Sequence, residues 1–364
     1  MQFDSNRKYL LSRPRGGFND TMVQIEKSIL YAAEYGRTLV LDTSRSGLRK
    51  QFNSIFEFYE EPPCRVIHWT TNFTEAFDSE SSVYPPQLKH RVSTYETEWN
   101  TAGHYFSDCY SKCAINFDHS KDNAAKILVY EQAAGGPASL NALNRLCLRP
   151  EIATVIAARL NSIGRGYDAV HIRHTDYKTD FEAFLKKLCP ALRGRRVLIC
   201  SDSYKAKSAA ASILHPSTVT LSVADIPDID GMPLHVADEV DFHCANIDLL
   251  CDLIAMSLAD NFYFTHLSGG NDNGVRYSGF SLLADLLKRN PHTVRRLLSS
   301  AEPSIVAPLF ERVSSPFDPV RRLHVLDCYR WNFGAKRKAF RRYRRAKTRH
   351  LTPDKIGPSY FENF

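Results

Sequence analysis

Residues 8–41 read KYLLSRPRGGFNDTMVQIEKSILYAAEYGRTLVL, and this stretch decides the fold class. It contains an apolar run at 8–12, a glycine-containing turn at 13–20, an apolar stripe with helical spacing, and a second apolar run at 38–41. We expect Asn19 or Asp20 to cap the helix, because a short side-chain oxygen accepts a hydrogen bond from a free amide. A strand, turn, helix and strand in this order predict a parallel sheet that binds its ligand at the carboxyl end of the first strand.

The same alternation returns further along the chain. Apolar runs predict strands at 126–130, 167–173, 196–201, 218–223 and 261–265. Periodic stripes predict helices at 139–147, 150–163, 181–188, 204–213, 247–259 and 279–287. Alternating strands and helices indicate an α/β fold with doubly wound sheets. Residues 53–122 have no clear period, and we interpret them as insertions or acceptor-side loops.

Length and composition limit the classes to which the protein can belong. The chain has 364 residues, 43% of them hydrophobic and 11% aromatic, which indicates two globular domains and excludes a disordered protein. No apolar run reaches the roughly 20 residues of a membrane span, and residues 1–7 are polar. The nine cysteines are scattered along the chain. These features predict reduced, buried thiols and a cytoplasmic protein.

The basic charge is concentrated near the end of the chain. There are 47 Lys and Arg against 40 Asp and Glu, and nine of the basic residues lie within 336–349, so the rest of the chain is nearly neutral. A solvated helix face and an amphipathic helix on an anionic membrane surface, at the inner membrane face, are the two main interpretations of this segment. Phosphate contacts with nucleic acid are a third interpretation, and the neutral remainder predicts no specific nucleic-acid binding.

Three clusters of residues follow predicted strands or begin predicted helices. They are Gly16-Gly17-Phe18-Asn19, His171-Ile172-Arg173-His174-Thr175-Asp176 and Ser278-Gly279-Phe280-Ser281. A pyrophosphate is bound by amides at helix N-termini and by a bidentate guanidinium, and these clusters supply both. Each cluster alone also has an ordinary explanation, as a turn, an ion pair or a helix cap.

Taken in order, these motifs resemble the GDP-fucose-dependent fucosyltransferase superfamily, which includes α1,6-fucosyltransferases, the rhizobial nodulation fucosyltransferase and protein O-fucosyltransferases. Residues 15–19 with the following helix and strand are similar to its N-terminal signature. The cluster at 171–176 is similar to its first donor motif, nearest the α1,6 branch. Ser201-Asp202-Ser203 resembles the second motif and 278–281 the third.

The resemblance implies a fold of the GT-B type, with two Rossmann-like domains and an interdomain cleft. The domains would be an N-terminal acceptor-side domain at 1–150, a GDP-sugar-binding domain at 151–300, and a helical extension with the basic tail at 301–364. It also implies a set of donor-binding residues. Arg173 would bind the pyrophosphate, His171 the nucleoside and Asp202 the guanosine end, and the remaining contacts would come from Gly16, Gly17, Phe18, Asn19, Asp176, Ser278, Gly279, Phe280 and Ser281.

The implied reaction is inverting transfer of fucose from GDP-fucose to a hydroxyl of a glycan or glycoconjugate. Arg173 would stabilise the leaving diphosphate without a metal ion, and no cofactor is expected. The general base would be Asp180 or Glu182, because Tyr177 shifts this segment relative to the family pattern. Asp228-Ile229-Asp230 is the closest match to a metal-binding Asp-X-Asp sequence. A protein O-fucosyltransferase-like enzyme and a non-catalytic nucleotide-sugar or glycan-binding protein are the alternatives.

Overall fold

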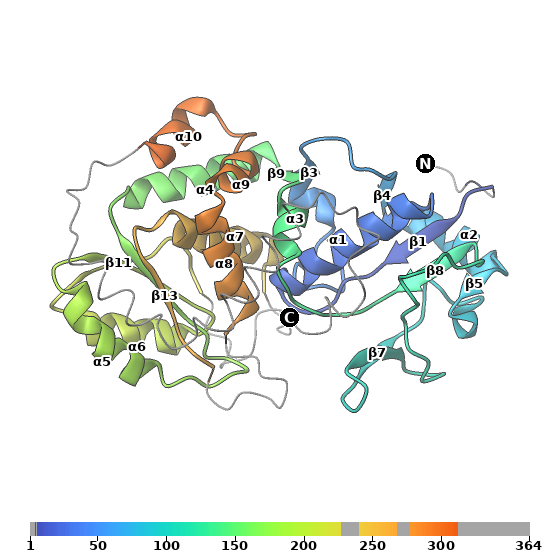
Figure 1. Ribbon diagram of the computed structural model, residues 1–364, viewed down its shortest axis with the longest axis horizontal. Helices are drawn as coiled ribbons and strands as arrows, with labels where there is room; N and C mark the ends of the chain where they lie inside the picture. Colours follow the sequence, from blue (N-terminus) through green and yellow to red (C-terminus); the bar gives the residue numbers. More distant parts are fainter. Residues whose placement is uncertain (1–3, 5, 227–239, 268–276, 312–364) are drawn as a thin grey trace, which may run out of the picture. The chain divides into compact units, whose positions relative to one another are not determined.

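Two parallel β-sheets organise the chain in this computed structural model, which describes residues 4, 6–226, 240–267 and 277–311 (Figure 1). The first sheet has the order β4-β2-β1-β8-β5, built from Val66–His68, Thr38–Leu41, Tyr9–Ser12, Ile127–Tyr130 and Val83–Tyr84. The second has the order β12-β11-β10-β13, built from Val219–Leu221, Arg196–Ser201, Asp168–Ile172 and Phe262–Phe264. The predicted mixed α/β fold with parallel sheets is therefore confirmed.

The central strands are buried on both faces. Every residue of β1 is buried, and β1 pairs in parallel with β2 and β8, with Leu10 opposite Leu39 and Leu128. Every residue of β10 is also buried, between β11 and β13. A strand covered on both faces has a continuous apolar sequence rather than an alternating one. This is why the apolar runs at 8–12 and 167–173 predict their strands well.

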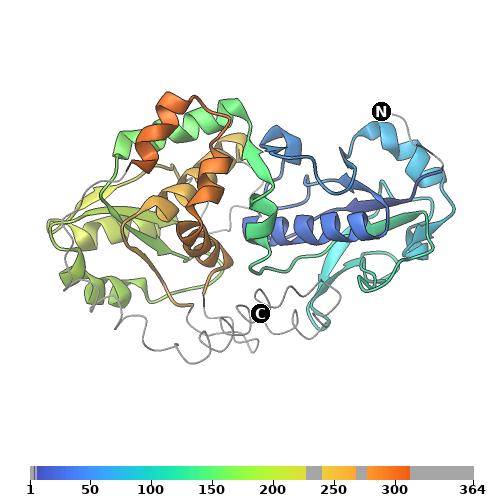
Figure 2. The ribbon, with the colours of Figure 1, turned by 45° about the horizontal axis from the view of Figure 1, so that its top comes forward.

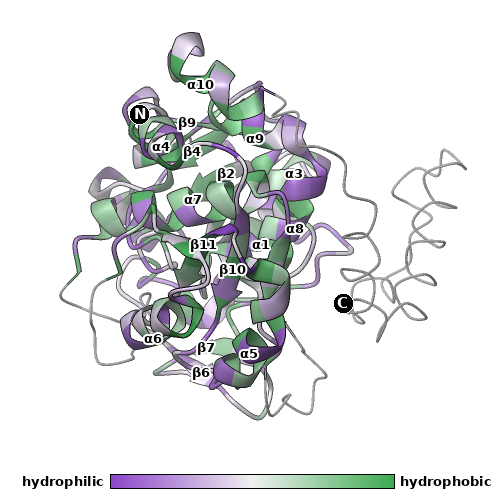
Figure 3. Cartoon of the chain, turned by 90° about the vertical axis from the view of Figure 1, so that its left-hand side faces the viewer, coloured by the Kyte–Doolittle hydropathy of each residue, from purple (hydrophilic) through white to green (hydrophobic). Residues whose placement is uncertain are grey.

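Helices of three to five turns cover these sheets. They are α1 (Phe18–Glu34), α4 (Pro150–Ile163), α5 (Phe181–Leu192), α6 (Tyr204–Leu214), α7 (Phe242–Leu258) and α8 (Gly279–Arg289). The shorter helices are α2 (Thr74–Ser79), α3 (Ser139–Leu143), α9 (Pro291–Leu297) and α10 (Pro303–Phe310). In Figure 3, α5 and α6 carry both hydrophobic and hydrophilic residues, as helices that cover one face of a sheet do. None of the helices in the described ranges is long and apolar enough to span a membrane.

Three sequence predictions about these elements are wrong in detail. The first helix begins at Phe18 with Gly17 as its cap, not after Asn19 or Asp20. The helix predicted at 139–147 ends at Leu143, and Leu146–Leu148 forms β9, which pairs antiparallel with β3 (Phe56–Phe58). Helix α7 begins at Phe242, where the Asp241 carboxylate accepts a hydrogen bond from the His243 amide at 2.9 Å.

Residues 53–122 are more regular than the sequence suggested. They contain β3, β4 and β5, and β4 and β5 are the two edge strands of the first sheet. They also contain an antiparallel hairpin of β6 (Thr97–Asn100) and β7 (Tyr105–Asp108). Strands of two to four residues are too short to show a hydrophobic period, so the sequence did not reveal them.

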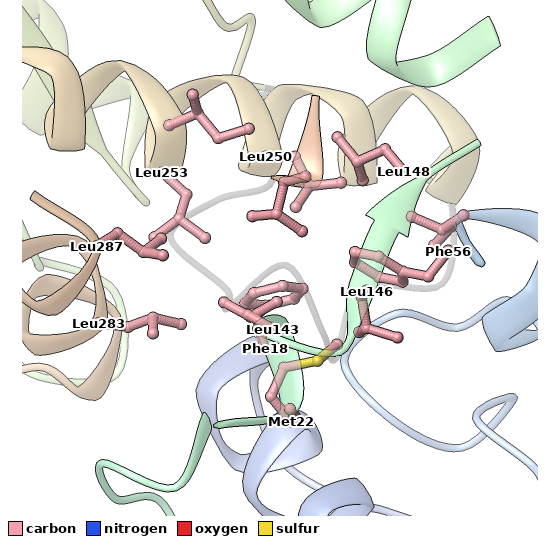
Figure 4. Packing of buried hydrophobic residues seen from close by; sticks show 14 of the residues in the cluster. Phe18, Met22, Phe56, Leu143, Leu146, Leu148, Leu250, Leu253, Leu283 and Leu287 are labelled. Carbon is pink, nitrogen blue, oxygen red and sulfur yellow. The ribbon is translucent and has the colours of Figure 1, made fainter. Parts of the chain in front are cut away.

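One hydrophobic cluster joins the helices of both sheets. Phe18 and Met22 from α1 contact the same core as Leu250 from α7 and Leu283 from α8 (Figure 4). Helix α1 also packs on α8, as Figure 1 and Figure 2 show. A polar contact adds to this, because the Asn246 side chain on α7 donates to the Leu48 carbonyl at 2.8 Å. The N-termini of α1 and α8 therefore lie at the edge of a shared core.

Strand alternation decides which side of the second sheet each residue faces. Val170 and Ile172 of β10 pack in one cluster with α5 and α6. Ala169 belongs to the larger core with α7 and α8. Because successive side chains of a strand point to opposite faces, His171 shares the side of Ala169 and faces α8.

Several predictions fall wholly or partly outside the described residues. Contacts divide the chain into Met1–Arg312 and Val313–Phe364, and the second unit is not described. The membrane-surface interpretation of 336–349 and the tail of the predicted extension at 301–364 therefore stay predictions, as do the domain boundaries near 150 and 300.

The eight cysteines of the described residues are free, and Cys244 is exposed, so not every thiol is buried as expected.

Candidate functional site

The predicted site residues follow the carboxyl ends of parallel strands in both sheets. The turn with Gly16 and Gly17 follows β1, and the loop from Glu131 follows the adjacent strand β8. The segment from Arg173 follows β10, and Asp202 follows its neighbour β11. Carboxyl ends of neighbouring parallel strands meet at one sheet edge, where α/β proteins bind their ligands.

The turn after β1 depends on its glycines. Gly16 has a φ of +83°, a left-handed conformation that glycine adopts without strain. Gly47 packs so closely that a Cβ atom there would lie 2.7 Å from the Gly16 carbonyl oxygen. Gly17 is the N-cap residue of α1, and no side-chain cap hydrogen bond is formed there. Phe18 is 4% exposed and packs on Phe56, so the structure places it in the core.

Asn19 connects the N-terminal motif with the motif at 278–281. Its side chain is buried, and a Cβ atom on Gly279 would lie 2.9 Å from Asn19 Nδ2. A Cβ atom on Gly135, in the loop after β8, would also lie 2.9 Å from this nitrogen. Because Gly135 and Gly279 have no side chains, both can approach the Asn19 amide closely. The N-termini of α1 and α8 therefore lie close together. Helix N-termini carry free N–H groups and partial positive charge, so a pair of them favours an anion.

His171 connects the second cluster to the same helix. Its Nδ1 atom lies 2.7 Å from the Ser281 hydroxyl oxygen, and its ring lies 5.5 Å from the Phe280 ring. His171 is 4% exposed, and burial lowers its pKa to about 4, so the imidazole is neutral at physiological pH. A neutral imidazole has one donor and one acceptor nitrogen, which suits recognition of an uncharged nucleoside group better than charge pairing.

Arg173 lies directly after β10 and pairs with two carboxylates. One terminal nitrogen lies 2.5 Å from Asp176 Oδ1 and the other 2.8 Å from Asp202 Oδ2. The sequence predicted Arg173 as a pyrophosphate ligand and Asp202 as a guanosine ligand. In the structure Asp202 also accepts hydrogen bonds from the His174 amide at 2.7 Å and the Thr175 hydroxyl at 2.5 Å. Asp202 therefore holds the segment after β10 in place and orients the Arg173 guanidinium.

The two candidate bases lie at the start of α5. The Asp180 carboxylate accepts a hydrogen bond from the Ala183 amide at 3.2 Å and so caps the helix. Glu182 lies in the first turn. Both side chains are exposed. Their catalytic role stays a prediction, and for Asp180 helix capping is a complete structural explanation.

A buried network of hydrogen bonds and ion pairs stabilises the turn after β1. The Glu131 carboxylate is completely buried and accepts hydrogen bonds from the Tyr95 hydroxyl at 2.6 Å and the Thr97 hydroxyl at 2.8 Å. Arg15 and Arg45 form ion pairs with the same carboxylate, at 3.1 and 3.3 Å. A buried charge with this many partners is costly to disturb. The network joins the loops after β1, β2 and β8 to the β6–β7 hairpin.

Sequence reasoning missed two parts of this site. Gly135 belongs to a glycine-containing loop, but nothing in the sequence connects it with Asn19. Asp20 was considered only as a helix cap. In the structure Asp20 lies in the first turn of α1, within the electrostatic influence of Arg173, and desolvation raises its pKa to about 6. The available signal was a carboxylate two positions after Phe18, but its desolvation depends on packing that the sequence does not show.

Within the described ranges, no three His, Cys, Asp or Glu side chains are grouped to hold a metal ion. Asp228 and Asp230 lie outside those ranges.

Comparisons with known proteins give structural likenesses only. No family model and no curated protein matches the chain. The crystal structure of NodZ alpha-1,6-fucosyltransferase co-crystallised with GDP is 19% identical, with a TM-score of 0.49, covering 78% of this chain and 93% of that one. A structure of fucosyltransferase NodZ from Bradyrhizobium is 20% identical, with a TM-score of 0.48, covering 78% and 94%.

A second protein of known structure is also similar to the chain. POFUT1 in complex with GDP-fucose is 14% identical, with a TM-score of 0.44, covering 78% of this chain and 94% of that one.

Proposed function

We propose that the protein transfers fucose from GDP-fucose to a hydroxyl of a glycan or glycoconjugate, with inversion and without a metal ion. The donor would lie between two Rossmann-like halves of a GT-B arrangement, with 1–150 on the acceptor side. One observation carries the proposal. Motifs from four separate parts of the chain meet: Asn19 contacts Gly279, His171 contacts Ser281, and Arg173 contacts Asp202.

The chemistry of glycosyl transfer explains why these groups belong together. When the bond from sugar to diphosphate breaks, negative charge develops on the leaving group and positive character on the sugar. Fixed donors aimed at the leaving group lower this barrier. The N-termini of α1 and α8 and the Arg173 guanidinium are such donors. Arginine offers a planar, permanently charged fork that matches two phosphate oxygens.

The acceptor hydroxyl must lose a proton during the reaction. Asp180 or Glu182 would take it, since both are exposed carboxylates on the segment that follows Arg173. We expect the amide variant of the residue that acts as base to lower kcat by roughly 100- to 10,000-fold. Asp180→Asn keeps a helix-capping side chain, so its effect on catalysis is separable from loss of the cap.

The decisive experiment measures GDP release from GDP-fucose in the presence of glycan acceptors, of folded protein acceptors, and of neither. Release that depends on a glycan supports the proposal. Release that depends only on a protein acceptor favours the protein O-fucosyltransferase alternative. Binding of GDP-fucose without release under any condition favours a non-catalytic binding protein, and absence of binding contradicts the assignment altogether.

A further inference from the structure

The β6–β7 hairpin, which projects from the first sheet in Figure 1, presents an exposed tryptophan. Trp99 on β6 is 42% exposed and lies directly opposite Phe106 on β7. The two rings meet at 61° with 5.0 Å between their centroids, so Phe106 packs against the indole without stacking on it. The ring of His104, in the turn that joins the strands, lies 6.3 Å from the indole. A large part of the indole therefore remains available for contact with a ligand.

This aromatic surface continues into the turn after β1. Because successive side chains of a strand point to opposite faces, Thr97, Trp99 and Phe106 share one face of the hairpin. Arg15 contacts that face: its guanidinium lies 4.9 Å from the centre of the Phe106 ring and donates to the Thr97 hydroxyl at 3.1 Å. Arg15 immediately precedes the two glycines at the start of α1. Trp99 thus lies on the face of the hairpin that contacts the candidate site.

The hairpin is anchored to the same edge of the first sheet as the site. The Gln132 side chain, in the loop after β8, accepts a hydrogen bond from the Phe106 amide at 2.9 Å and donates one to the Phe106 carbonyl at 3.0 Å. The neighbouring Glu131 carboxylate accepts the hydrogen bond from Thr97 at 2.8 Å. Both anchoring side chains are buried. A surface that is fixed before the ligand arrives loses little conformational entropy on binding.

The chemistry of an exposed indole favours a sugar ring. A pyranose has C–H groups on its faces and hydroxyl groups around its rim. The face of an aromatic ring carries excess negative charge, which attracts the slightly positive C–H groups, and stacking removes apolar surface from water. The indole N–H can also donate to a hydroxyl of the same sugar. Trp99 therefore matches a ligand that is apolar on one face and polar around its edge.

The residues around Trp99 distinguish a glycan from a protein partner. Its exposed neighbours in the hairpin include Glu98, Thr101 and His104, which are polar. Protein interfaces are marked by a contiguous apolar patch with a polar rim. One indole among polar groups provides the contact area of a single sugar ring instead.

The charges of the hairpin also argue against a nucleic acid. Glu98 forms an ion pair with Lys112 at 2.9 Å, and Asp108 forms an ion pair with Arg91. Positive and negative charges are thus balanced in these pairs. Binding of a nucleic acid through stacked bases also requires an excess of positive charge for its phosphates. A neutral ligand has no such requirement.

We propose that Trp99 stacks on a neutral pyranose ring of a glycan acceptor, so that the β6–β7 hairpin is an acceptor-binding surface. The inference rests on the proposed function and specifies its acceptor as an oligosaccharide. Arg15 separates Trp99 from the glycines at the start of α1, where the donor would lie. The sugar on Trp99 is therefore not the sugar that receives fucose, and an acceptor of two or more sugars binds better than a monosaccharide.

Binding of the full chain to neutral oligosaccharides tests this proposal. The probes are oligomers of glucose, galactose, mannose and N-acetylglucosamine, each one to four sugars long. We expect the wild type to bind at least one oligomer more tightly than its monosaccharide, and Trp99→Ala to raise the Kd for that oligomer roughly tenfold or more. For transfer to the same oligomer, KM should rise with little change in kcat, because stacking is equally strong before and during the reaction.

Three variants provide the controls. Trp99→Tyr keeps an aromatic face and should retain most of the binding. Trp99→Leu keeps apolar area but has no aromatic face, so it should bind as weakly as Trp99→Ala. Tyr110→Ala removes a ring that is 87% exposed from the turn after β7, and it should bind like the wild type.

Several outcomes would overturn the inference. Equal binding of oligosaccharides by the wild type and by Trp99→Ala does so, as does wild-type binding by Trp99→Leu, which indicates an apolar docking surface. Binding of a single-stranded dT oligonucleotide that depends on Trp99, without binding of any oligosaccharide, assigns the surface to nucleic acid.

Two further outcomes separate this inference from the proposed function. A wild-type protein that binds GDP-fucose but none of the oligosaccharides contradicts only the role of Trp99, and this result does not depend on whether a variant folds. A Trp99→Ala protein that lowers kcat at unchanged KM contradicts it as well. A wild-type protein that does not bind GDP-fucose shows that the proposed function is wrong, whatever it does with oligosaccharides.

Discussion

His171 Nδ1 lies 2.7 Å from the hydroxyl oxygen of Ser281, although 110 residues separate them in the chain. This hydrogen bond joins the central strand of the second sheet to the first turn of α8. Because α8 also contacts Asn19, one helix N-terminus connects motifs that lie in the two sheets.

Changing Arg173 to Lys keeps one positive charge but removes the fork that contacts Asp176 and Asp202. We expect kcat/KM for fucosyl transfer to fall ~100-fold or more, about 3 kcal/mol of transition-state stabilisation. Steady-state kinetics with GDP-fucose checks this. Arg193→Lys, at an exposed position beyond α5, serves as the control. Near-normal transfer by Arg173→Lys would leave Arg173 as an ordinary ion-pair residue and remove the basis of the motif assignment.

Changing Gly279 to Ala places a methyl group 2.9 Å from Asn19 Nδ2. In a helix without this contact, alanine would be more stable than glycine by up to about 1 kcal/mol. We expect the opposite here, a lower free energy of unfolding, because the N-termini of α1 and α8 must separate. Urea denaturation measures the difference. Gly17→Ala is the comparison, since its Cβ atom would meet Asp20 Oδ2 at an ordinary 3.8 Å. Equal effects of the two changes would contradict the close approach.

Leu283 and Leu282 are neighbours on α8 with opposite environments. Leu283 is completely buried in the shared core, whereas Leu282 is 37% exposed. We expect Leu283→Ala to lower the free energy of unfolding by about 2–5 kcal/mol, because a cavity is added to the lost transfer free energy. Leu282→Ala should cost much less. Chemical denaturation followed by tryptophan fluorescence tests both, and similar losses would argue against the shared core.

Stability should depend on the protonation of His171. Burial lowers its pKa to about 4 in the folded protein, against 6.5 as the reference value, so below pH 6.5 the unfolded chain binds more protons. Stability contributed by the neutral imidazole is thus present above pH 6.5 and is lost as the pH falls towards 4. Burial also lowers the pKa of His68 and, to about 4, that of His119, so both add to the same trend.

The variant His171→Asn should lose stability less steeply than the wild type between pH 6.5 and 4.5. His243→Asn, at an exposed position, should follow the wild-type curve. Free energies of unfolding in urea at several pH values give both slopes. A His171→Asn curve parallel to the wild type would show that His171 titrates normally.

Treatment with EDTA should leave fucosyl transfer unchanged, since Arg173 and the two helix N-termini are expected to stabilise the leaving group. The measurement is the initial rate of GDP release before and after the chelator, with added Mg²⁺ or Mn²⁺ as the comparison. Loss of activity with EDTA that a divalent cation restores would direct attention to Asp228 and Asp230. It would also weaken the argument for Arg173.

The sequence alone predicted the long elements well and the short ones poorly. The apolar run 197–200 predicts the strand Arg196–Ser201, because a strand covered on both faces has a continuous apolar sequence in its interior. Pro150 predicts the start of α4 because proline lacks the amide that the first turn leaves free. The sequence pattern wrongly predicted helix for the short strand Leu146–Leu148. This strand exists because it pairs with β3, which lies far away in the chain, and a local sequence pattern does not reveal such a pairing.

The sequence by itself determined which groups are available for chemistry: glycine turns after strands, one arginine at the end of β10 and hydroxyls at the start of α8. Only the tertiary structure decided what they contact. Burial and long-range packing set the pKa of Asp20 and of His171, the pairing of Arg173 with Asp202, and the approach of Asn19 to Gly279. These properties depend on distances between segments that are far apart in the chain, and such distances exist only after both sheets have packed around the shared core.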